Sequence, residues 1–446
     1  MIEVQEMAKF ERIEKNARMN RKLNILIITH YFPPVRSNAF LRPYSWAKYW
    51  SEAGHNVFVI TTKKAVYKNS PKFSGSYNVI EVGFLGQRLV EEHKRLSSDE
   101  SAKKGPLDNI KLVTLKWLRD FVYLTSSKFS LFSAERIPEP FFFWKRNAMK
   151  EIVKIQSEYG IDCIVSTYAP PSAHILAYRI KKRFPKAKWI SDYRDSWTVS
   201  NYVFPGLPVV RNFEKHIEDK IIQSTDLITA VSPTLVDEFR SRFPNKRVEL
   251  VENGFLDEIN PTEAVNLGGG INLVYTGSYG GYRTLKFLDD FLRKLKYEDK
   301  DLYKKIHIYV AGRGKESFKN EKIFFLGDVP YEMSIAYQNA ADILFIVESD
   351  QGIAKGTLTG KLFEYLRAKK PIIAFGPTED SDLAKYLRET GAGVVSKKDY
   401  QSVYNAIKFA ISPKVTIDDS KIDRFSRKNL ALKFLSLIED LCATKE

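Results

Sequence analysis

Short apolar runs alternate with amphipathic helical stretches along almost the whole of this 446-residue chain. That alternation is typical of parallel β-strands connected through helices, because a strand buried on both faces reads as a continuous apolar segment. The first series of predicted strands is Asn24–His30, Asn56–Thr62, Asn78–Phe84, Asp162–Tyr168, Lys188–Tyr193, Asp226–Val231 and Val248–Asn253. The second series is Ile271–Gly277, Lys305–Ala311, Lys322–Val329, Asp342–Glu348, Pro371–Phe375 and Gly393–Ser396.

The two series predict an α/β chain with two Rossmann-like domains, since one core rarely organises this many residues. We expect an N-terminal domain over 24–254 and a C-terminal domain over 255–419. The final helix, within 420–446, is expected to cross back to the first domain, and 1–23 form a charged extension. Ligands in such sheets bind beyond the carboxyl ends of the strands, so each domain is expected to offer one wall of a cleft.

Composition limits the classes of protein that this chain can represent. Hydrophobic residues make up 44% and charged residues 28%, as in globular proteins, and no apolar run is long enough to span a bilayer. Cys163 and Cys442 offer neither a disulfide framework nor a metal-binding spacing, so we expect a cytoplasmic protein. Residues 1–150 hold 26 Lys and Arg against 14 Asp and Glu, which predicts an acidic partner for this half.

The segment from Thr359 to Gly376 predicts a helix that begins at Gly360-Lys361, followed by a buried strand. The N-terminus of a helix exposes unpaired backbone N–H groups, which can bind a diphosphate. Glu364 lies one turn into this helix, where its carboxylate can hold the two hydroxyls of a ribose. The segment therefore indicates a nucleotide-sugar site.

A glycine-rich turn follows the first strand of the second series. It begins with Gly277-Ser278 and continues to two cations, Arg283 and Lys286. Glycine allows a ligand to approach the backbone closely, and the cations can neutralise phosphate oxygens. Arg313, in a second glycine-containing turn, adds a cation at the same edge of the predicted sheet. We interpret these turns as a phosphate-binding region, although the glycines alone could simply form the turns.

The N-terminal half contributes three weaker candidates. The turn after its first strand contains Ser37 and Asn38, and Arg42 follows on the next helix. Such a turn is often only a connection, but the first strand-to-helix turn of a Rossmann sheet commonly binds ligands. The second candidate is the loop of Tyr168 and His174. His174 is a possible general acid or base near neutral pH, although a lone histidine in a first helical turn is more often structural.

The third candidate is the segment Asp192-Tyr193-Arg194-Asp195, where two carboxylates and an arginine meet at the end of a buried strand. One interpretation places these side chains in a functional site. The other is a self-satisfied Asp–Arg network that holds the loop, and both can be true together.

The order and spacing of these motifs resemble those of GT-B glycosyltransferases of the large retaining group called family four, or glycosyl transferases group 1. The resemblance extends from Asn24 to the final helix, Phe425–Leu441. The segments that carry it are Ile25–Arg42, Gly54–Val57, Asp192–Trp197, Val231–Pro233, Val251–Gly254, Gly277-Ser278, Ala311–Gly314, Gly360–Leu366 and Lys370–Ile372.

This resemblance implies that the C-terminal domain binds a nucleoside-diphosphate sugar and that the N-terminal domain binds the acceptor. It implies transfer with retention, without a metal or a cofactor beyond the nucleotide sugar. The implied catalytic residues are Arg283, Lys286, His174 and Asp192. The histidine that many relatives have near the reacting sugar has no unambiguous match, because His174 and Tyr168 both lie in the corresponding loop. The implied donor-binding residues are Ser37, Asn38, Gly277, Ser278, Arg313, Thr359, Gly360, Lys361 and Glu364, with Arg42, Tyr168 and Asp195 on the acceptor side.

Two positions depart from the family pattern. The family often has two glutamates separated by seven residues; Glu364 matches the second, but Gly356 occupies the first position. Glu348 is one of several nearby residues that could contact the sugar instead. In addition, Ser37-Asn38 stands where many relatives have paired glycines. The donor sugar therefore stays open.

Residues 111–150 interleave basic and aromatic side chains. Exposed, they would suit an anionic membrane surface; buried, they would belong to a helix of the acceptor domain. Relatives commonly extend lipid-linked saccharides in cell-surface polysaccharide assembly, which favours peripheral attachment to the inner face of the cytoplasmic membrane. The alternatives are a nucleotide-sugar 2-epimerase or hydrolase on the same fold, and a basic nucleic-acid-binding module, for which no recognition motif is present.

Overall fold

The computed structural model describes residues 21–34, 38–63, 75–83, 144–198, 208–257, 264–314, 316–350, 355–413 and 415–443. The chain forms two compact units. The first, which we call the N-terminal domain, comprises residues 1–231, 235–251 and 431–446, and the second, the C-terminal domain, comprises 232–234 and 252–430. The domain boundary predicted from the sequence lies between residues 254 and 255.

The N-terminal domain is built on a seven-stranded parallel sheet with the order β3-β2-β1-β4-β5-β6-β7. Its strands are β1 (Asn24–Ile28), β2 (Asn56–Thr62), β3 (Asn78–Val82), β4 (Cys163–Tyr168), β5 (Lys188–Tyr193), β6 (Leu227–Ala230) and β7 (Val248–Leu250). The helices are η1 (Asn38–Phe40), α2 (Leu41–Glu52), α5 (Lys145–Glu158), α6 (Pro171–Arg183), α7 (Pro208–Ser224) and α8 (Pro233–Arg242).

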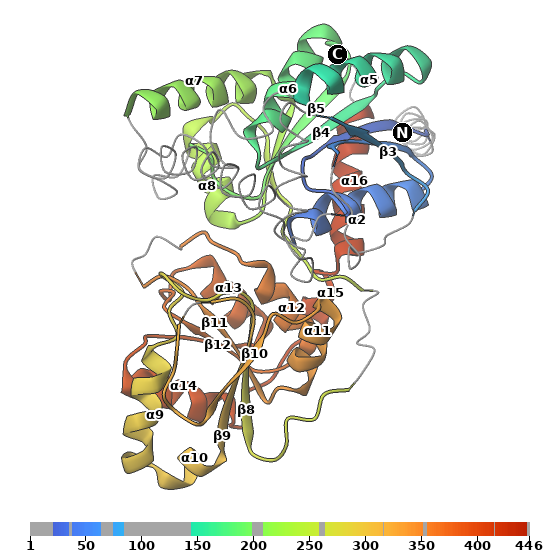
Figure 1. Cartoon of the computed structure of the whole chain (residues 1–446). Helices are drawn as coiled ribbons and strands as arrows, with labels where there is room; N and C mark the ends of the chain where they lie inside the picture. The colour runs from blue at the N-terminus through green and yellow to red at the C-terminus, as the bar shows by residue number, and fades with distance from the viewer. Residues whose placement is uncertain are drawn as a thin grey trace, which may run out of the picture. The chain divides into compact units, whose positions relative to one another are not determined.

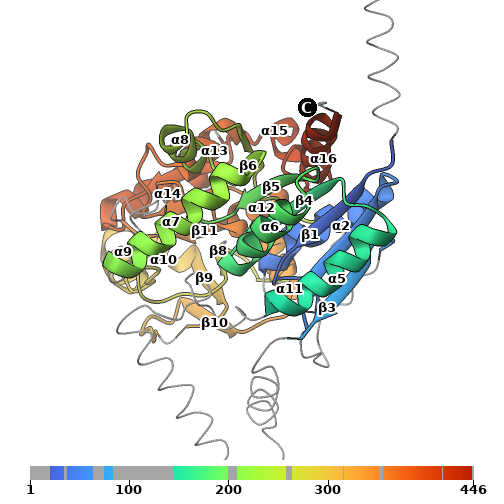
Figure 2. The same ribbon diagram turned by 90° about the horizontal axis from the view of Figure 1, so that it is seen from above.

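Helices cover both faces of this sheet. Apolar side chains of α5, α6, α7 and α8 pack on one face, where α5, α6 and α7 lie side by side (Figure 2). Next to α2 lies the last helix, α16 (Arg427–Ala443), as Figure 1 shows. The ring of Phe434 contacts Trp46 and Trp50 edge-on at 5.1 and 5.4 Å, and Trp50 Nε1 donates to the Ala431 carbonyl at 2.8 Å. The end of the chain therefore completes the core of the N-terminal domain.

The C-terminal domain is built on a six-stranded parallel sheet with the order β10-β9-β8-β11-β12-β13. Its strands are β8 (Ile271–Thr276), β9 (Ile306–Ala311), β10 (Ile323–Gly327), β11 (Ile343–Val347), β12 (Ile372–Phe375) and β13 (Gly393–Ser396). The helices are α9 (Phe287–Glu298), α10 (Lys300–Lys305), α11 (Tyr331–Ala340), α12 (Gly360–Ala368), α13 (Asp382–Thr390), α14 (Tyr400–Ala410) and α15 (Asp419–Asp423).

In this domain α9, α10 and α14 supply the apolar side chains on one face of the sheet, and α12 and α13 supply those on the other. Figure 1 labels these helices around the sheet. The central strand β11 is buried along its whole length, as expected for a parallel strand covered on both faces. The loops at the carboxyl ends of these strands are therefore positioned by a rigid, two-sided core.

The predicted fold class is confirmed, and each predicted strand is present. The structure shortens several of them by one to three residues; the run Lys322–Val329, for example, contains the strand Ile323–Gly327. Predicted strand residues that lie beyond the carboxyl ends of the observed strands form loops instead. These loops contain the candidate functional residues. Within the described residues, none of the helices combines the length and the apolar character needed to cross a bilayer.

Candidate functional site

The C-terminal sheet has a topological switch point at β8, which lies between β9 and β11. Helical connections leave β8 and β11 toward opposite faces of the sheet, and ligands of such sheets bind beyond the carboxyl ends of the strands at this point. The loops after β8, β9 and β11 are therefore the structural candidates for a site. They contain the glycines, cations and carboxylates that the sequence indicates.

Two of these loops approach each other through glycine backbone. Gly277 has φ +133° and Gly312 has φ +150°, and the Gly277 N–H donates to the Ala311 carbonyl at 2.7 Å. A Cβ on Gly312 would lie 2.0 Å from the carbonyl oxygen of Gly277. Glycine at position 312 is therefore required by the close contact of the two loops.

We expect Gly312→Ala to lower the free energy of unfolding by about 2 kcal/mol or more, because the new methyl group collides with backbone and the positive φ is strained. Gly269→Ala is the matched control, since Gly269 lies in the same domain and a Cβ added there would meet no atom within 4 Å. Urea unfolding of both variants tests this expectation. Equal stability of the two would contradict it.

Helix α12 begins as the sequence predicts. Thr359 is its N-cap, with an extended backbone and a side-chain oxygen that accepts from the Lys361 N–H at 3.4 Å. Leu362 and Phe363 are fully buried against the sheet, which anchors the first turn. The Leu362 N–H also donates to the Thr359 carbonyl, at 3.1 Å. The positive end of the helix dipole at Gly360 is therefore what α12 offers to an anion.

The Lys361 side chain folds back over β8. Its Nζ donates to the Tyr275 hydroxyl at 2.9 Å and lies 4.6 Å from the centre of the Tyr275 ring. Burial, together with the nearby Arg283 cation, lowers the pKa of Lys361 to about 8, although Glu348 and Glu364 oppose that shift. Lys361 is therefore a cation close to both Arg283 and Glu364.

Arg283 forms an ion pair with Glu348, the residue that follows β11. Arg283 Nη2 lies 3.0 Å from Glu348 Oε1, and the Arg283 Nε is 3.2 Å from each carboxylate oxygen. The Glu348 side chain is 2% exposed, whereas that of Arg283 is 28% exposed. Glu348 thus fixes Arg283 at the switch point. In this arrangement the Glu348 carboxylate is paired with Arg283, and its contact with a sugar stays a prediction.

Glu364 lies in the second turn of α12 and is almost completely buried. The Tyr331 hydroxyl donates to its Oε1 at 3.1 Å, and Gln338 Nε2 donates to its Oε2 at 3.3 Å. Burial raises the pKa of Glu364 above its ordinary value, although Gln338 and Tyr331, with two nearby cations, oppose the rise. Tyr331 and Gln338 are not among the residues predicted from the sequence. The available signal was the polar Gln338 among buried apolar neighbours on α11.

Two further predicted cations are exposed. Lys286 immediately precedes α9 with its side chain in solvent. Arg313 follows β9, with Nε donating to Asp328 at 2.8 Å and a side chain that is 73% exposed. Ser278 offers its carbonyl to the Tyr275 hydroxyl at 2.6 Å. The structure therefore brings Arg283, Lys361 and Glu364 together, with Lys286 and Arg313 on loops at the same edge.

In the N-terminal domain, Asp192 is fully buried at the carboxyl end of β5. It accepts from Arg42 Nη2 at 2.6 Å and Nε at 3.1 Å, and from the hydroxyls of Thr167 and Thr229 at 2.8 Å each. This is the self-satisfied network of the second interpretation, but its arginine is Arg42 on α2 rather than Arg194. A catalytic role for Asp192 and an acceptor role for Arg42 stay predictions.

Arg194 instead stabilises the loop backbone. Its Nε donates to the Tyr168 carbonyl at 2.9 Å, its Nη2 donates to the Ala169 carbonyl at 3.2 Å, and its guanidinium lies 4.7 Å from the centre of the Tyr31 ring. The exposed Asp195 is 3.8 Å from Arg194 Nε. Of the two predicted carboxylates, Asp195 alone faces solvent, and its role on the acceptor side stays a prediction.

His174 is fully buried and packs in an aromatic cluster with Tyr168 and Tyr193. Its Nδ1 is 2.7 Å from the Ser166 hydroxyl, and burial lowers its pKa to about 3, despite the Asp192 charge. His174 therefore stays neutral at pH 7, which corrects the expectation of a histidine that titrates near neutrality. Tyr168 is 1% exposed. A catalytic role for His174 and an acceptor-side role for Tyr168 stay predictions.

Several predicted features lie outside the described residues. These are Ser37, residues 1–20 of the predicted extension 1–23, and residues 111–143, which are most of the aromatic and basic segment. For Asn38 the structure describes the backbone, as the first residue of η1. Within the described part of the aromatic segment, Trp144 and Lys145 are buried. These two residues are therefore core residues rather than surface residues.

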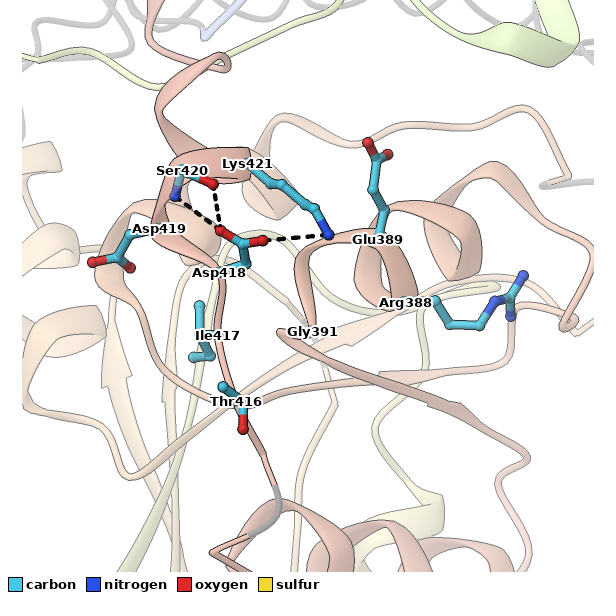
Figure 3. Close-up of a pocket in the computed structure, with 9 residues that line it drawn as sticks. All are labelled: Arg388, Glu389, Gly391, Thr416, Ile417, Asp418, Asp419, Ser420 and Lys421. Carbon is cyan, nitrogen blue, oxygen red and sulfur yellow. Dashed lines mark hydrogen bonds and ion pairs between the residues drawn. The ribbon is translucent and has the colours of Figure 1, made fainter.

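A shallow hollow of about 630 Å³ lies elsewhere in the C-terminal domain. Figure 3 shows the residues that line it. It is lined by residues 388, 389, 391 and 416–421. Gly391 precedes β13, so the hollow lies at the amino end of that strand, opposite to the edge where ligands bind. Asp418 is satisfied by the Ser420 N–H and hydroxyl at 3.1 and 2.6 Å and by Lys421 at 3.3 Å. The hollow is therefore separate from the candidate site.

Solved structures of GT-B glycosyltransferases are similar to nearly the whole chain. A glycosyltransferase from Rickettsia africae has a TM-score of 0.58 at 15% identity, covering 94% of this chain and 99% of its own. An E. coli structure described as trehalose-6-phosphate bound with UDP-2-fluoro glucose has a TM-score of 0.58 at 10% identity, covering 93% and 99%. An α,α-trehalose-phosphate synthase (UDP-forming) from Burkholderia xenovorans, in complex with glucose-6-phosphate, has a TM-score of 0.56 at 11% identity, covering 94% and 99%.

No protein-family model matches the sequence, and no curated protein matches it. At these identities the similarity shows the fold. The predicted GT-B architecture, with two Rossmann-like domains, is thereby confirmed.

Proposed function

We propose that this protein is a hexosyltransferase-type glycosyltransferase that moves a sugar from a nucleoside-diphosphate sugar to a hydroxyl group of a lipid-linked or oligosaccharide acceptor. The observation that supports this most strongly is the grouping of Arg283, Lys361 and Glu364 with the N-terminus of α12 at one switch point. A helix N-terminus and two cations suit a diphosphate, and a buried carboxylate suits a ribose.

In this proposal the first turn of α12, with Arg283, Lys286 and Lys361, binds the diphosphate, and Glu364 accepts hydrogen bonds from the ribose hydroxyls. Arg313 lies toward the base or the phosphates. Negative charge develops on the departing diphosphate, and preorganised cations stabilise that charge in the transition state. These side chains would take the place of a divalent ion, and the resemblance to family four favours retention of configuration.

The acceptor is proposed to bind the N-terminal domain, whose sequence carries most of the positive charge. The UDP-2-fluoro glucose and glucose-6-phosphate named for the similar structures support a nucleotide sugar as donor and a sugar-type acceptor. A lipid-linked acceptor in polysaccharide biosynthesis, at the inner face of the cytoplasmic membrane, follows from the family resemblance and the basic N-terminal half. An anionic membrane surface is the acidic partner that this charge suits.

Label transfer tests the proposal. The protein is incubated with nucleoside-diphosphate sugars labelled in the sugar, with and without lipid-linked and free oligosaccharide acceptors. We expect label in the acceptor and release of the nucleoside diphosphate. Conversion of the donor to its epimer without any acceptor would identify a 2-epimerase instead, and free labelled sugar with every acceptor would identify a hydrolase.

Lys361 gives the donor site a predicted pH dependence. Its pKa of about 8 means that the ammonium is charged at neutral pH and loses its proton as the pH rises through 8. Nucleoside-diphosphate affinity is therefore expected to fall above about pH 8, by up to about tenfold for each pH unit. Lys361→Arg, which keeps its charge, should remove that fall, and Lys370→Arg should leave it in place. A flat wild-type profile in titration calorimetry would contradict this account of Lys361.

A further inference from the structure

The Glu364 carboxylate is held from one side by a single neighbouring helix. Tyr331 and Gln338 lie seven residues apart on α11, two helical turns, and therefore share one face. The Tyr331 hydroxyl donates to one carboxylate oxygen at 3.1 Å, and the Gln338 amide donates to the other at 3.3 Å. Each oxygen of Glu364 thus receives one hydrogen bond from α11.

The orientation of the Gln338 amide follows from its partners. The atom assigned as Nε2 also lies 3.0 Å from Thr276 Oγ1 and 3.4 Å from Ser334 Oγ. A carboxylate oxygen only accepts, so the amide atom facing Glu364 has to be the nitrogen. Gln338 is 1% exposed, and Thr276 is the last residue of β8. The contacts therefore tie α11 and α12 to the end of the strand at the switch point.

We propose that Tyr331 and Gln338 are positioning residues that orient the Glu364 carboxylate to receive the two hydroxyls of the donor's ribose. This inference rests on the proposed function. A carboxylate offers about four lone-pair sites, two on each oxygen. The hydrogen bonds from α11 occupy one lone-pair site on each oxygen, so one site on each oxygen remains for a ligand. A ribose has two adjacent hydroxyl groups that can donate to these two sites. Two-point acceptance requires a fixed carboxylate plane, which the two bonds from α11 provide.

The charge of Glu364 depends on the same contacts. The groups that act on this carboxylate are Tyr331 and Gln338 of α11, Lys361 and Tyr365 of its own helix, and Arg427 of α16. Burial favours the neutral acid, while the two donors and the two cations favour the carboxylate. Loss of either donor should therefore raise the pKa of Glu364. A protonated Glu364 accepts one ribose hydroxyl less well, so binding should become weaker as the pH falls.

Titration calorimetry with a matched pair of ligands tests this role. The variants are Tyr331→Phe and Gln338→Met, with Tyr337→Phe as the control, because Tyr337 lies on the same helix and packs against the apolar core. The ligands are UDP and GDP and their 2′,3′-dideoxy counterparts, from about pH 5.5 to about pH 8. We expect each variant to bind the ribose ligand about tenfold more weakly, with a loss that grows toward low pH. The dideoxy ligand should show almost no loss, and the control should match the wild type.

Equal losses for the ribose and dideoxy ligands would overturn the proposal, because they would indicate a packing role. Wild-type affinity in both variants would overturn it as well. If Tyr331→Phe fails to fold, Gln338→Met still tests the proposal, because Gln338 donates to the other oxygen of the Glu364 carboxylate. Failure of the proposed function gives a different result: Glu364→Gln would then bind UDP and GDP as tightly as the wild type, or the wild type would bind neither.

Discussion

Glu364→Ala is expected to weaken the binding of a nucleoside diphosphate by about a hundredfold. In the proposed donor site, the variant would remove two hydrogen bonds in which the Glu364 carboxylate accepts from the ribose, and such bonds contribute about 1.5 kcal/mol or more each. Together they correspond to about 3 kcal/mol, or about two powers of ten in affinity. Titration calorimetry near pH 7 measures the change directly, with UDP and GDP as ligands.

Glu332→Ala is the control for this prediction. Glu332 is exposed in the first turn of α11, next to Tyr331. Its replacement should leave the affinity unchanged. Glu364→Gln, which keeps the volume of the side chain, separates loss of binding from loss of packing and should also bind weakly. Wild-type affinity in both Glu364 variants would show that the donor site has been placed incorrectly.

Arg42→Ala or Asp192→Ala is expected to lower the free energy of unfolding by about 3–5 kcal/mol, because each leaves a buried charge without its partner. The Arg42 and Asp192 side chains are 3% and 0% exposed. Thr167 and Thr229 can still donate to an isolated Asp192, but they supply no positive charge. Urea unfolding of the single variants measures the loss.

The Arg42→Met/Asp192→Leu double variant should recover part of this stability, since it removes both charges together. Lys154→Ala is the control, because the Lys154–Glu151 pair on α5 in the same domain is exposed at 70% and 36% and should contribute little. A single variant of the buried pair that is as stable as Lys154→Ala would contradict the structural role of this network.

The sheets could be predicted from the sequence because their strands are buried on both faces. The run Ile343–Val347, for example, is apolar without interruption and becomes the central strand β11. The start of α12 was also predictable, because Thr359 and Gly360 are local signals. Periodicity and capping act over a few residues, so they can be read without knowledge of the fold.

The pairing of charges could not be predicted in the same way. Asp192 is two residues from Arg194 but is bonded to Arg42, 150 residues away. Arg283 and Glu348 are 65 residues apart, and the order of β8 and β11 in the sheet brings them together. The complete burial of His174 could not be predicted either, because it depends on packing between elements that are distant in the sequence. Long-range partners follow from the order of the strands in the sheet, which the spacing of motifs along the chain does not give.

The central claim is that the donor binds at the switch point of the C-terminal sheet. Hydrogen exchange in the presence and absence of a nucleoside diphosphate tests it most directly, because it locates the bound ligand on the unmodified, full-length chain. The first ligand is the one among UDP, GDP and ADP that stabilises the protein most. The measurement is then repeated with ADP-, GDP- and UDP-sugars. We expect slower exchange in residues 277–286 and 359–364, around the switch point of the C-terminal sheet. Protection confined to the N-terminal domain or to residues 416–421, or no protection by any of these ligands, would contradict the account.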